Sequence, residues 1–388
     1  MAAPKKTNGG PGDNVPARLY LIDGSGFIFR AFHSSPLDAF RRSDGVYTNA
    51  VNGYCALLMK MIDRARDDGA YDYMAVIFDA SRKNFRNDIY PEYKANRDAP
   101  PEELRPQFAL IREATVAFGL PSIELEGYEA DDLIATYARE AEAQGIETVV
   151  VSSDKDLMQL VREHVYMFDP MKDQVIGPDE VMAKFGVTPD KVVDVQSLAG
   201  DSTDNVPGVP GIGVKTAALL LDEYGDLDTL LERAGEIKQN KRRENLIEYA
   251  DLARVSRELV RLKDDVETDH KIEDFALKDP DPATVVDFLK AMEFRTLTQR
   301  VENRFVSEGL MAESDTTAAA PVEAPVDASY ELVQDEAALQ AWVDTARNAG
   351  FVAFDTETTS LNAMRAQLVG FSLSTVPGQA CYVPVGHV

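Results

Sequence analysis

Three short apolar runs constrain the fold of this 388-residue chain more than any other feature. They occupy residues 19–22, 74–78 and 148–151, and each is long enough to form one buried strand. Between them, apolar residues recur every three or four positions, which is typical of helices that cover a core. Strands that alternate with helices predict a parallel sheet with helices on both faces. The predicted fold class is therefore α/β, with a mostly parallel central sheet.

Each predicted strand leads directly into an aspartate: Asp23, Asp79 and Asp154. Ligands of open parallel sheets bind outside the carboxyl ends of the strands, so three aspartates there would share one rim. Any one of them could equally well cap a helix. That interpretation is harder to sustain for all three together.

Further acidic residues follow at the spacing of one helix face, in the segments Glu-Ala-Asp-Asp, Asp-Lys-Asp and Asp-Ser-Thr-Asp. Each pair alone would more often be a solvated helix start. Converging on one sheet edge, the whole set would repel strongly unless cations were bound, and Mg²⁺ or Mn²⁺ prefers such oxygen ligands. Two such ions could hydrolyse a phosphodiester, whereas only four histidines and two cysteines offer a zinc alternative. The candidate metal ligands are Asp23, Asp79, Glu129, Asp131, Asp132, Asp154, Asp156, Asp201 and Asp204.

The ordered motifs around these acids resemble the 5′ nuclease (flap-endonuclease) family over residues 18–305. The likeness is greatest to members that form the amino-terminal domain of a bacterial DNA polymerase. The resemblance implies a PIN-like fold and a metal-dependent 5′–3′ exonuclease and 5′-flap endonuclease. It also implies two metal clusters: Asp23, Asp79, Glu129 and Asp131 with Asp132 nearby in one, and Asp154, Asp156, Asp201 and Asp204 in the other.

A glycine-rich segment follows the last acidic pair and resembles the helix–hairpin–helix element of this family. Glycines allow a close approach of the backbone to a phosphate, and the next helix presents free N–H groups. The alternative is an ordinary Gly/Pro turn between packed helices. The predicted DNA contacts here are Gly208, Gly211, Gly213, Lys215 and Thr216, and the resemblance implies a K⁺ ion at this hairpin.

Residues 81–97 mix five basic residues with three aromatic ones directly after Asp79. Such a mixture suits a single strand, because rings stack on bases while cations neutralise phosphates. A solvated amphipathic helix is the alternative. The resemblance implies an arch at about residues 82–103, with Lys94 and Arg97 contacting the scissile phosphate. The remaining predicted DNA contacts are Arg30, Arg82, Lys83, Arg86 and Tyr93.

Composition divides the chain into five segments. We expect a disordered tail at 1–17, the nuclease α/β domain at 18–186 and a helical helix–hairpin–helix subdomain at 187–305. A linker rich in Ala, Pro, Thr, Glu and Asp is expected at 306–329. Residues 330–388 then begin a further apolar pattern. Asp355 and Glu357 there resemble the first motif of DnaQ-type 3′–5′ exonucleases, which implies an RNase H-like domain with an incomplete second site.

The remaining features bound where the chain works. Its net charge of −26 does not exclude DNA, because a binding face is a local matter. The chain has no apolar run long enough for a membrane span, no secretory h-region and only two cysteines. We therefore expect a bacterial cytosolic monomer whose partner is DNA with 5′ ends, flaps or nicks, including RNA primers, and not a membrane.

Two other interpretations stay open. The chain could be a DNA-structure-binding module in which the carboxylates are bystanders, or a 5′ nuclease that stands alone without a polymerase. The linker and the start of a further domain favour the polymerase-linked interpretation over the second alternative.

Overall fold

The computed structural model describes residues 17–67, 72–312, 329–359, 366–376 and 378–385. The chain forms two compact units, divided between Ser314 and Asp315. Most of the expected tail and of the expected linker (residues 1–16 and 313–328) lies outside the described residues. The last two residues of helix α13 (Arg295–Ser307) lie in the segment that was expected to be a linker.

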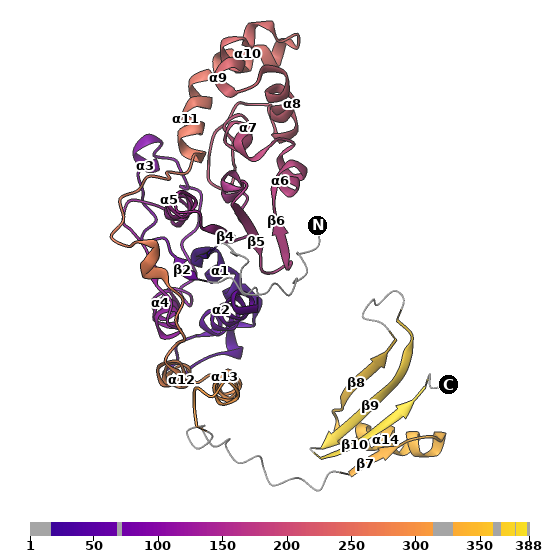
Figure 1. The fold of residues 1–388 in the computed structure, drawn as a ribbon. Coiled ribbons are helices and arrows are strands. Elements are labelled where there is room, and N and C mark those ends of the chain that lie inside the picture. The colour runs from indigo at the N-terminus through magenta and orange to yellow at the C-terminus, as the bar shows by residue number, and fades with distance from the viewer. Residues whose placement is uncertain (1–16, 68–71, 313–328, 360–365, 377, 386–388) are drawn as a thin grey trace, which may run out of the picture. The chain divides into compact units, whose positions relative to one another are not determined.

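The first unit is built on a six-stranded sheet in the order β3-β2-β1-β4-β5-β6 (Figure 1). All neighbours are parallel except β6, which runs antiparallel to β5. The strands are β1 (Arg18–Asp23), β2 (Tyr73–Ile77), β3 (Ser122–Ile123), β4 (Glu147–Val151), β5 (Val165–Asp169) and β6 (Gln174–Ile176). The predicted mostly parallel sheet is confirmed, and the short edge strands β3 and β6 are additions to it.

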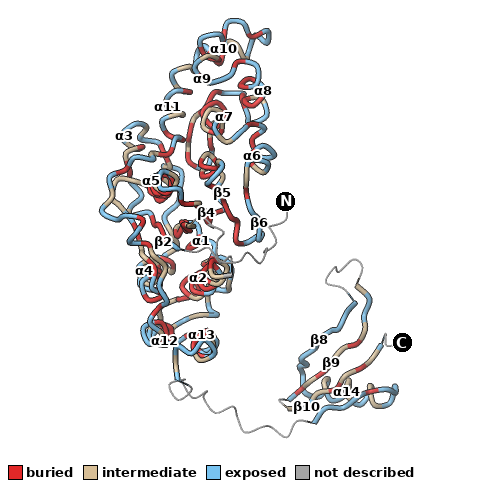
Figure 2. The backbone as a smooth tube through the Cα atoms, in the orientation of Figure 1, coloured by how far each residue is buried: buried red, intermediate tan, exposed pale blue. Residues whose placement is uncertain are grey.

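Both faces of this sheet are buried, because successive side chains of a strand point to opposite faces. In β1, Leu19 and Leu21 join one core, while Tyr20 and Ile22 join the other. Figure 2 shows the central strands mostly as buried tube, and β1, β2 and β4 are buried at every residue after the first. A sheet covered on both faces leaves its strand ends as the place where polar side chains can gather.

Helices of the first unit divide between these two cores. One core contains α1 (Gly24–Ser34), α2 (Asn49–Asp67), α4 (Gln107–Ala117), α12 (Pro282–Ala291) and α13. The other contains α5 (Ala130–Ala143) and continues into the helical segment α6 (Pro178–Phe185), α7 (Val192–Ala199), α8 (Val214–Tyr224), α9 (Leu227–Glu232), α10 (Asn240–Glu248) and α11 (Ala250–Val260). In Figure 1 the helices α8 to α11 form the end of the unit farthest from α12 and α13.

Short elements complete the first unit. Between Asp79 and α4 the described chain contains only one helix, α3 (Arg86–Ile89), and otherwise turns. Five further short segments form 3₁₀ helices: Leu37–Ala39, Asp156–Leu160, Pro189–Lys191, Ala234–Glu236 and Ile272–Phe275. The segment expected as an arch is thus mostly non-helical in this structure.

The second unit is a four-stranded sheet in the order β7-β10-β9-β8 with one helix packed on it. Its elements are β7 (Ser329–Leu332), α14 (Glu336–Ala349), β8 (Ala353–Thr358), β9 (Leu368–Val376) and β10 (Gln379–Pro384). Its small core joins Val333, Leu373, Cys381 and Val383 to side chains of α14. Cys55 and Cys381 are both free thiols. Among the described residues, no helix combines the length and the apolar character that crossing a membrane requires.

Candidate nuclease site

The three strand-end aspartates lie at the carboxyl edge of the sheet. Asp23 ends β1 and caps α1, accepting hydrogen bonds from Gly26 N at 2.9 Å and from Ser152 Oγ at 2.8 Å. Asp79 accepts one from Ala130 N at 2.8 Å, at the start of α5. The backbone N of Asp154 donates to Ser152 Oγ at 3.0 Å. Ser152, just beyond β4, therefore joins Asp23 to the Asp154 turn.

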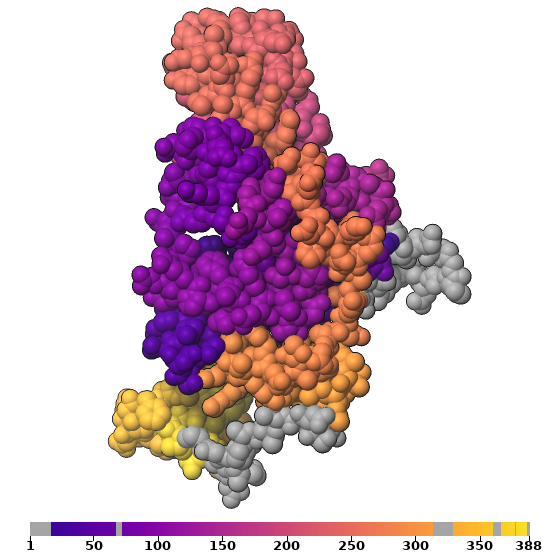
Figure 3. Space-filling model, turned by 90° about the vertical axis from the view of Figure 1, so that its left-hand side faces the viewer, coloured from indigo at the N-terminus to yellow at the C-terminus, as the bar shows by residue number. Residues whose placement is uncertain are grey.

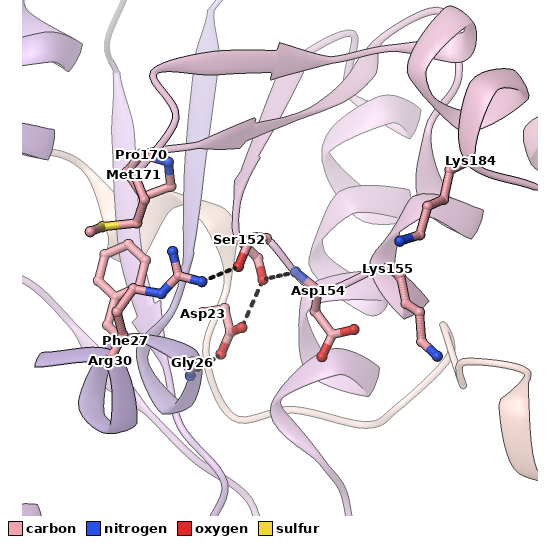
Figure 4. A pocket seen from close by; sticks show the side chains of 11 residues that line it. Asp23, Gly26, Phe27, Arg30, Ser152, Asp154, Lys155, Pro170, Met171 and Lys184 are labelled. Atoms are coloured by element: carbon pink, nitrogen blue, oxygen red, sulfur yellow. Dashed lines mark hydrogen bonds between the residues drawn. The ribbon is translucent and has the colours of Figure 1, made fainter. Parts of the chain in front are cut away.

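A cavity of about 360 Å³ opens beside this edge, lined by Asp23, Arg30, Asp154, Lys155, Lys184 and neighbouring residues. Figure 4 shows the acids Asp23 and Asp154 between Arg30 on one side and the two lysines on the other. Arg30 donates to Ser153 Oγ at 3.1 Å. The cavity thus presents carboxylates and cations side by side, which suits a phosphate and cations bound together.

Helix α5 contributes three acids from its first turn, and they have different environments. Glu129 lies at the N-cap, where Asn84 Nδ2 donates to it at 2.9 Å and Tyr93 OH at 3.1 Å. Asp131 lines a small cavity together with Asp156, Asp201 and Asp204. Asp132 is fully buried and pairs with Arg86. Consecutive helical positions differ by about 100°, so Asp131 faces the rim while Asp132 faces inward.

The second acidic group comes from the turn after β4 and the turn after α7. Gln196 Nε2 donates to Asp156 at 2.5 Å, and Thr203 N donates to Asp201 at 2.7 Å. Lys155 pairs with Asp201, and Arg97 pairs with Asp204. Each of these two aspartates therefore already has a cationic partner from the same chain.

Lys94 joins the two acidic groups. Its Nζ lies 2.5 Å from Glu129 Oε1 and 3.5 Å from Asp204 Oδ2, and its backbone N donates to Asp204 O at 2.9 Å. Its φ of 55° lies in the left-handed region, which non-glycine residues rarely adopt. Such a conformation persists only where surrounding contacts hold it, and here both the ammonium and the backbone are held.

The pKa values divide the acids into neutralised and unneutralised ones. Burial opposes ionisation of Glu129, but Lys94 and Arg86 together hold its pKa below the usual range. Lys155 does the same for Asp201, again against burial. Burial, reinforced by neighbouring carboxylates, raises the pKa of Asp23 to about 6 and of Asp156 to about 7, and raises that of Asp131 strongly.

Within the described part of the chain, no three His, Cys, Asp or Glu side chains already have the spacing of a metal site. The reason is visible in the pairs above, because Lys94, Arg97 and Lys155 hold three of the acids. The remaining acids lie in a buried setting, and burial first and the neighbouring carboxylates second raise their pKa values. An all-oxygen, like-charged donor set of this kind fits hard divalent cations.

The residues predicted to contact DNA from the arch segment are exposed in two cases and buried in two others. Arg82 and Lys83 are exposed, and Arg82 donates to the carbonyls of Arg97 and Asp98. Arg86 is fully buried, although we expected it to contact DNA. Tyr93, also expected at the DNA, is buried against Val206, Leu259 and Val260. Figure 3 shows the purple segment that carries α3 packed directly against the salmon-coloured helices above it. As the chain lies here, both side chains are buried, beside the small cavity that Asp131 also lines.

The glycine-rich hairpin has the close backbone contacts that glycine permits. Gly208 has a φ of +63°, and its N donates to Ser256 Oγ at 3.0 Å. Gly211 has a φ of +78°, and Asn245 Nδ2 donates to the carbonyl of the preceding Pro210 at 2.7 Å. Gly213 caps α8, whose first turn carries exposed Lys215 and half-buried Thr216. Helices α10 and α11 therefore hold the hairpin in place from behind.

In the second unit, Asp355 and Glu357 lie on β8 and are exposed. Two residues apart in a strand, they share one face of the sheet.

Several polar side chains at the site were absent from the predicted set. Ser152, Gln196 and Asn84 each donate to one of the acids, and Lys155 neutralises another. Lys155 could have been found, because it stands between Asp154 and Asp156 and must lie near their charges. The amides carry no comparable signal.

The first unit thus has an α/β fold, with acids at the carboxyl edge of its sheet and a helical segment after it. Solved structures share it: a phage T5 5′-exonuclease with bound divalent metal ions (zinc) has a TM-score of 0.53 and 21% identity, covering 75% of this chain and 97% of that one. The T5 D15 flap endonuclease in a complex with DNA and metal ions has a TM-score of 0.52 and 19% identity, covering 75% and 98%. These likenesses establish the fold, and they confirm the predicted fold class.

Sequence comparisons are more specific. Residues 18–186 match the 5′–3′ exonuclease N-terminal resolvase-like domain, residues 187–283 the 5′–3′ exonuclease C-terminal SAM fold, and residues 330–388 a 3′–5′ exonuclease family. The 5′–3′ exonuclease of Aquifex aeolicus is 37% identical over 74% of this chain and 96% of its own length. DNA polymerase I of Rhizobium leguminosarum is 47% identical over 95% of this chain but only 43% of its own length.

The chain therefore belongs to the 5′–3′ exonuclease family, and the predicted nuclease class is confirmed. It spans less than half the length of the DNA polymerase I relatives that it matches.

Gly208→Ala should lower the free energy of unfolding by about 1–3 kcal/mol. The substituted residue keeps a φ of +63°, and its Cβ would lie 2.4 Å from Gly200 N, which is backbone and cannot move aside. Gly213→Ala is the matched control, because its Cβ would meet nothing within 4 Å. Urea denaturation of both variants checks this, and equal stabilities would contradict it.

The metal-free protein should lose stability as the pH rises from about 5 to about 8. In this window the folded state binds more protons than the unfolded chain, because Asp23 and Asp156 have pKa values of about 6 and about 7. Melting temperatures in EDTA across the window measure the slope, which Asp156→Asn should flatten. A melting temperature in EDTA that climbs across the window would refute the assignment.

Proposed function

We propose that the chain hydrolyses DNA phosphodiesters near a 5′ end, both as a 5′–3′ exonuclease and as a 5′-flap endonuclease. The observation that carries the proposal is that acids from five separate segments lie at one sheet edge and in the turns beside it, where Lys94 and Arg97 pair with Glu129 and Asp204. The substrates proposed are DNA with 5′ ends, flaps or nicks, including RNA primers on DNA, and the protein acts as a monomer. This chemistry would serve primer removal and repair in the bacterial cytosol.

Mg²⁺ or Mn²⁺ is the proposed cofactor, in two clusters. Asp23, Asp79, Glu129 and Asp131 would hold the first, and Asp154, Asp156, Asp201 and Asp204 the second. Divalent ions supply Lewis acidity toward the phosphodiester and toward the water that attacks it. Asp132 is left out of the first cluster, because all its hydrogen-bonding capacity is directed at Arg86 and at backbone N–H groups.

Lys94 and Arg97 are proposed to exchange partners when substrate binds. Each now neutralises carboxylates, Glu129 and Asp204, that divalent cations would neutralise instead. Once released, an ammonium and a guanidinium at this position can bind the scissile phosphate and offset the charge that develops on it. Arg30, on the wall of the adjoining cavity, would orient a neighbouring phosphate.

The hairpin is proposed to bind a backbone phosphate of the duplex. The N–H groups at the start of α8 are available to it, and Lys215 is exposed beside them. K⁺ is the proposed ion at this hairpin, together with Gly208, Gly211 and Gly213.

A longer parent protein is also proposed. The identity to DNA polymerase I supports the view that this chain is the nuclease part of such an enzyme, joined to the start of a 3′–5′ exonuclease domain. Asp355 and Glu357 would then be part of the second nuclease site.

Cleavage of an end-labelled 5′-flap duplex should require Mg²⁺ or Mn²⁺ and stop in EDTA. Asp131→Asn should slow cleavage more than about 100-fold, the scale of losing a group that stabilises the transition state, while binding of the flap changes little. Asp287→Asn, which alters an exposed acid on α12, is the matched control and should cleave normally.

Gel electrophoresis of the products under single-turnover conditions gives the rate, and fluorescence anisotropy gives the binding. Metal-independent cleavage, or an Asp131→Asn variant as fast as Asp287→Asn, would reject the proposed chemistry. Binding without cleavage in every variant would instead favour a DNA-structure-binding module.

A further inference from the structure

The most completely buried ion pair of the described chain joins Arg86 and Asp132. Arg86 NH1 donates to Asp132 Oδ2 at 2.8 Å, and NH2 donates to Oδ1 at 2.7 Å, so the pair is bidentate. Both residues have a relative exposure of 0%. Planar two-point geometry of this kind fixes orientation as well as distance.

The rest of the Arg86 guanidinium binds backbone that is far away in sequence. Its Nε donates to Leu259 O at 2.7 Å, and NH2 also donates to Arg261 O at 3.1 Å. Asp132 in turn accepts from Lys263 N at 2.9 Å. The pair therefore fastens the base of the arch and the start of α5 to the end of α11 and the segment after it.

The same network reaches Glu129. Asp132 Oδ2 accepts from Glu129 N at 3.1 Å, and Arg86 NH1 lies 3.6 Å from Glu129 Oε2. Asn84 completes the circuit: its Oδ1 accepts from Arg86 N at 2.8 Å, while its Nδ2 donates to Glu129 Oε1. Both the backbone and the carboxylate of Glu129 are thereby held, and Asn84 and Lys94 donate to the same oxygen, Oε1.

A buried ion pair is a poor source of stability, because desolvation of the two charges can exceed their attraction. Its geometric value is higher, since a bidentate pair with every remaining group bonded tolerates only one arrangement of the segments that it joins. Here those segments carry Glu129, Lys94 and Arg97. Both residues are fully buried, and Arg86 contributes to the wall of the small cavity that Asp131, Asp156, Asp201 and Asp204 also line.

We propose that Arg86 is a positioning residue of the nuclease reaction, acting through Asp132 and Glu129 and fastening the arch base to the end of α11. The inference rests on the proposed function but can fail separately from it. If the wild-type chain cleaves flaps and the Arg86 variants cleave equally well, the function stands and the inference falls.

The test compares Arg86→Met, Arg86→Lys and the double variant Arg86→Met/Asp132→Leu. The double variant removes both charges, so it leaves no uncompensated buried acid, whereas removal of the arginine charge alone does. The matched control is Arg18→Met, which breaks a partly buried pair with Glu147 at the opposite end of β1.

The kcat of the double variant should fall about 10- to 100-fold, as is typical when support behind a catalytic group is lost. The KM for the flap substrate should stay within a factor of about three, because the exposed DNA contacts are untouched. Arg86→Lys should be intermediate, since lysine restores the charge without the planar fork. Assays are run at a temperature where circular dichroism shows each variant folded.

Hydrogen exchange of the metal-free protein, without DNA, provides a readout that does not depend on activity. Amides in residues 90–97 and 259–263 should exchange faster in the double variant than in the wild type. In Arg18→Met their exchange rates should be unchanged. The proposal would be overturned if the double variant folds and keeps the wild-type kcat, or if its amide exchange is unchanged in both segments.

Discussion

Accumulation of negative charge at one sheet edge is the constraint on which the rest of this structure depends. A parallel sheet buried on both faces directs its strand ends to one rim, and this chain places acids from several further turns there as well. Like charges in a partly buried setting cost free energy unless they are neutralised or protonated. The chain uses both solutions: Lys94, Arg97 and Lys155 neutralise some acids, and raised pKa values mark others.

This neutralisation explains local conformations that would otherwise be unfavourable. Lys94 adopts a left-handed backbone because its N–H and its ammonium are both directed at Asp204 and Glu129. Asn205, next to Asp204, has a φ of 56° and donates from its side chain to Glu92 O at 2.6 Å. Two turns that are about a hundred residues apart thus interlock through contacts made at the acidic rim. Lys94 and Arg97 are thus held in this structure by carboxylates that are also proposed metal ligands.

The sequence was sufficient for those features that depend on local pattern. Apolar runs predicted β1, β2 and β4, helical spacing predicted α2, α4 and α5, and the acids at the strand ends followed from the rule for parallel sheets. Strands β3 and β6 were not predicted, because two or three residues at a sheet edge carry too little periodicity. Residues 81–97 predicted a DNA-facing segment, yet Tyr93 and Arg86 are buried by α11. The sequence of that segment alone does not indicate that α11, more than 150 residues later, packs on it.

Asp131 and Asp132 show most clearly where sequence reasoning ends. They are chemically identical neighbours in one helical turn, and a spacing argument placed both near a metal. The rotation between consecutive helical residues directs one to the rim and the other into the core. Arg86 makes the buried position possible for Asp132, because an aspartate can be fully buried only where a partner offsets its charge. That arginine looked like a DNA contact for the same reason that Asp132 looked like a metal ligand: each charge was considered without its partner. In this chain Asp132 differs from the proposed metal ligands because it is fully buried and all its hydrogen bonds are made to Arg86 and to backbone N–H groups.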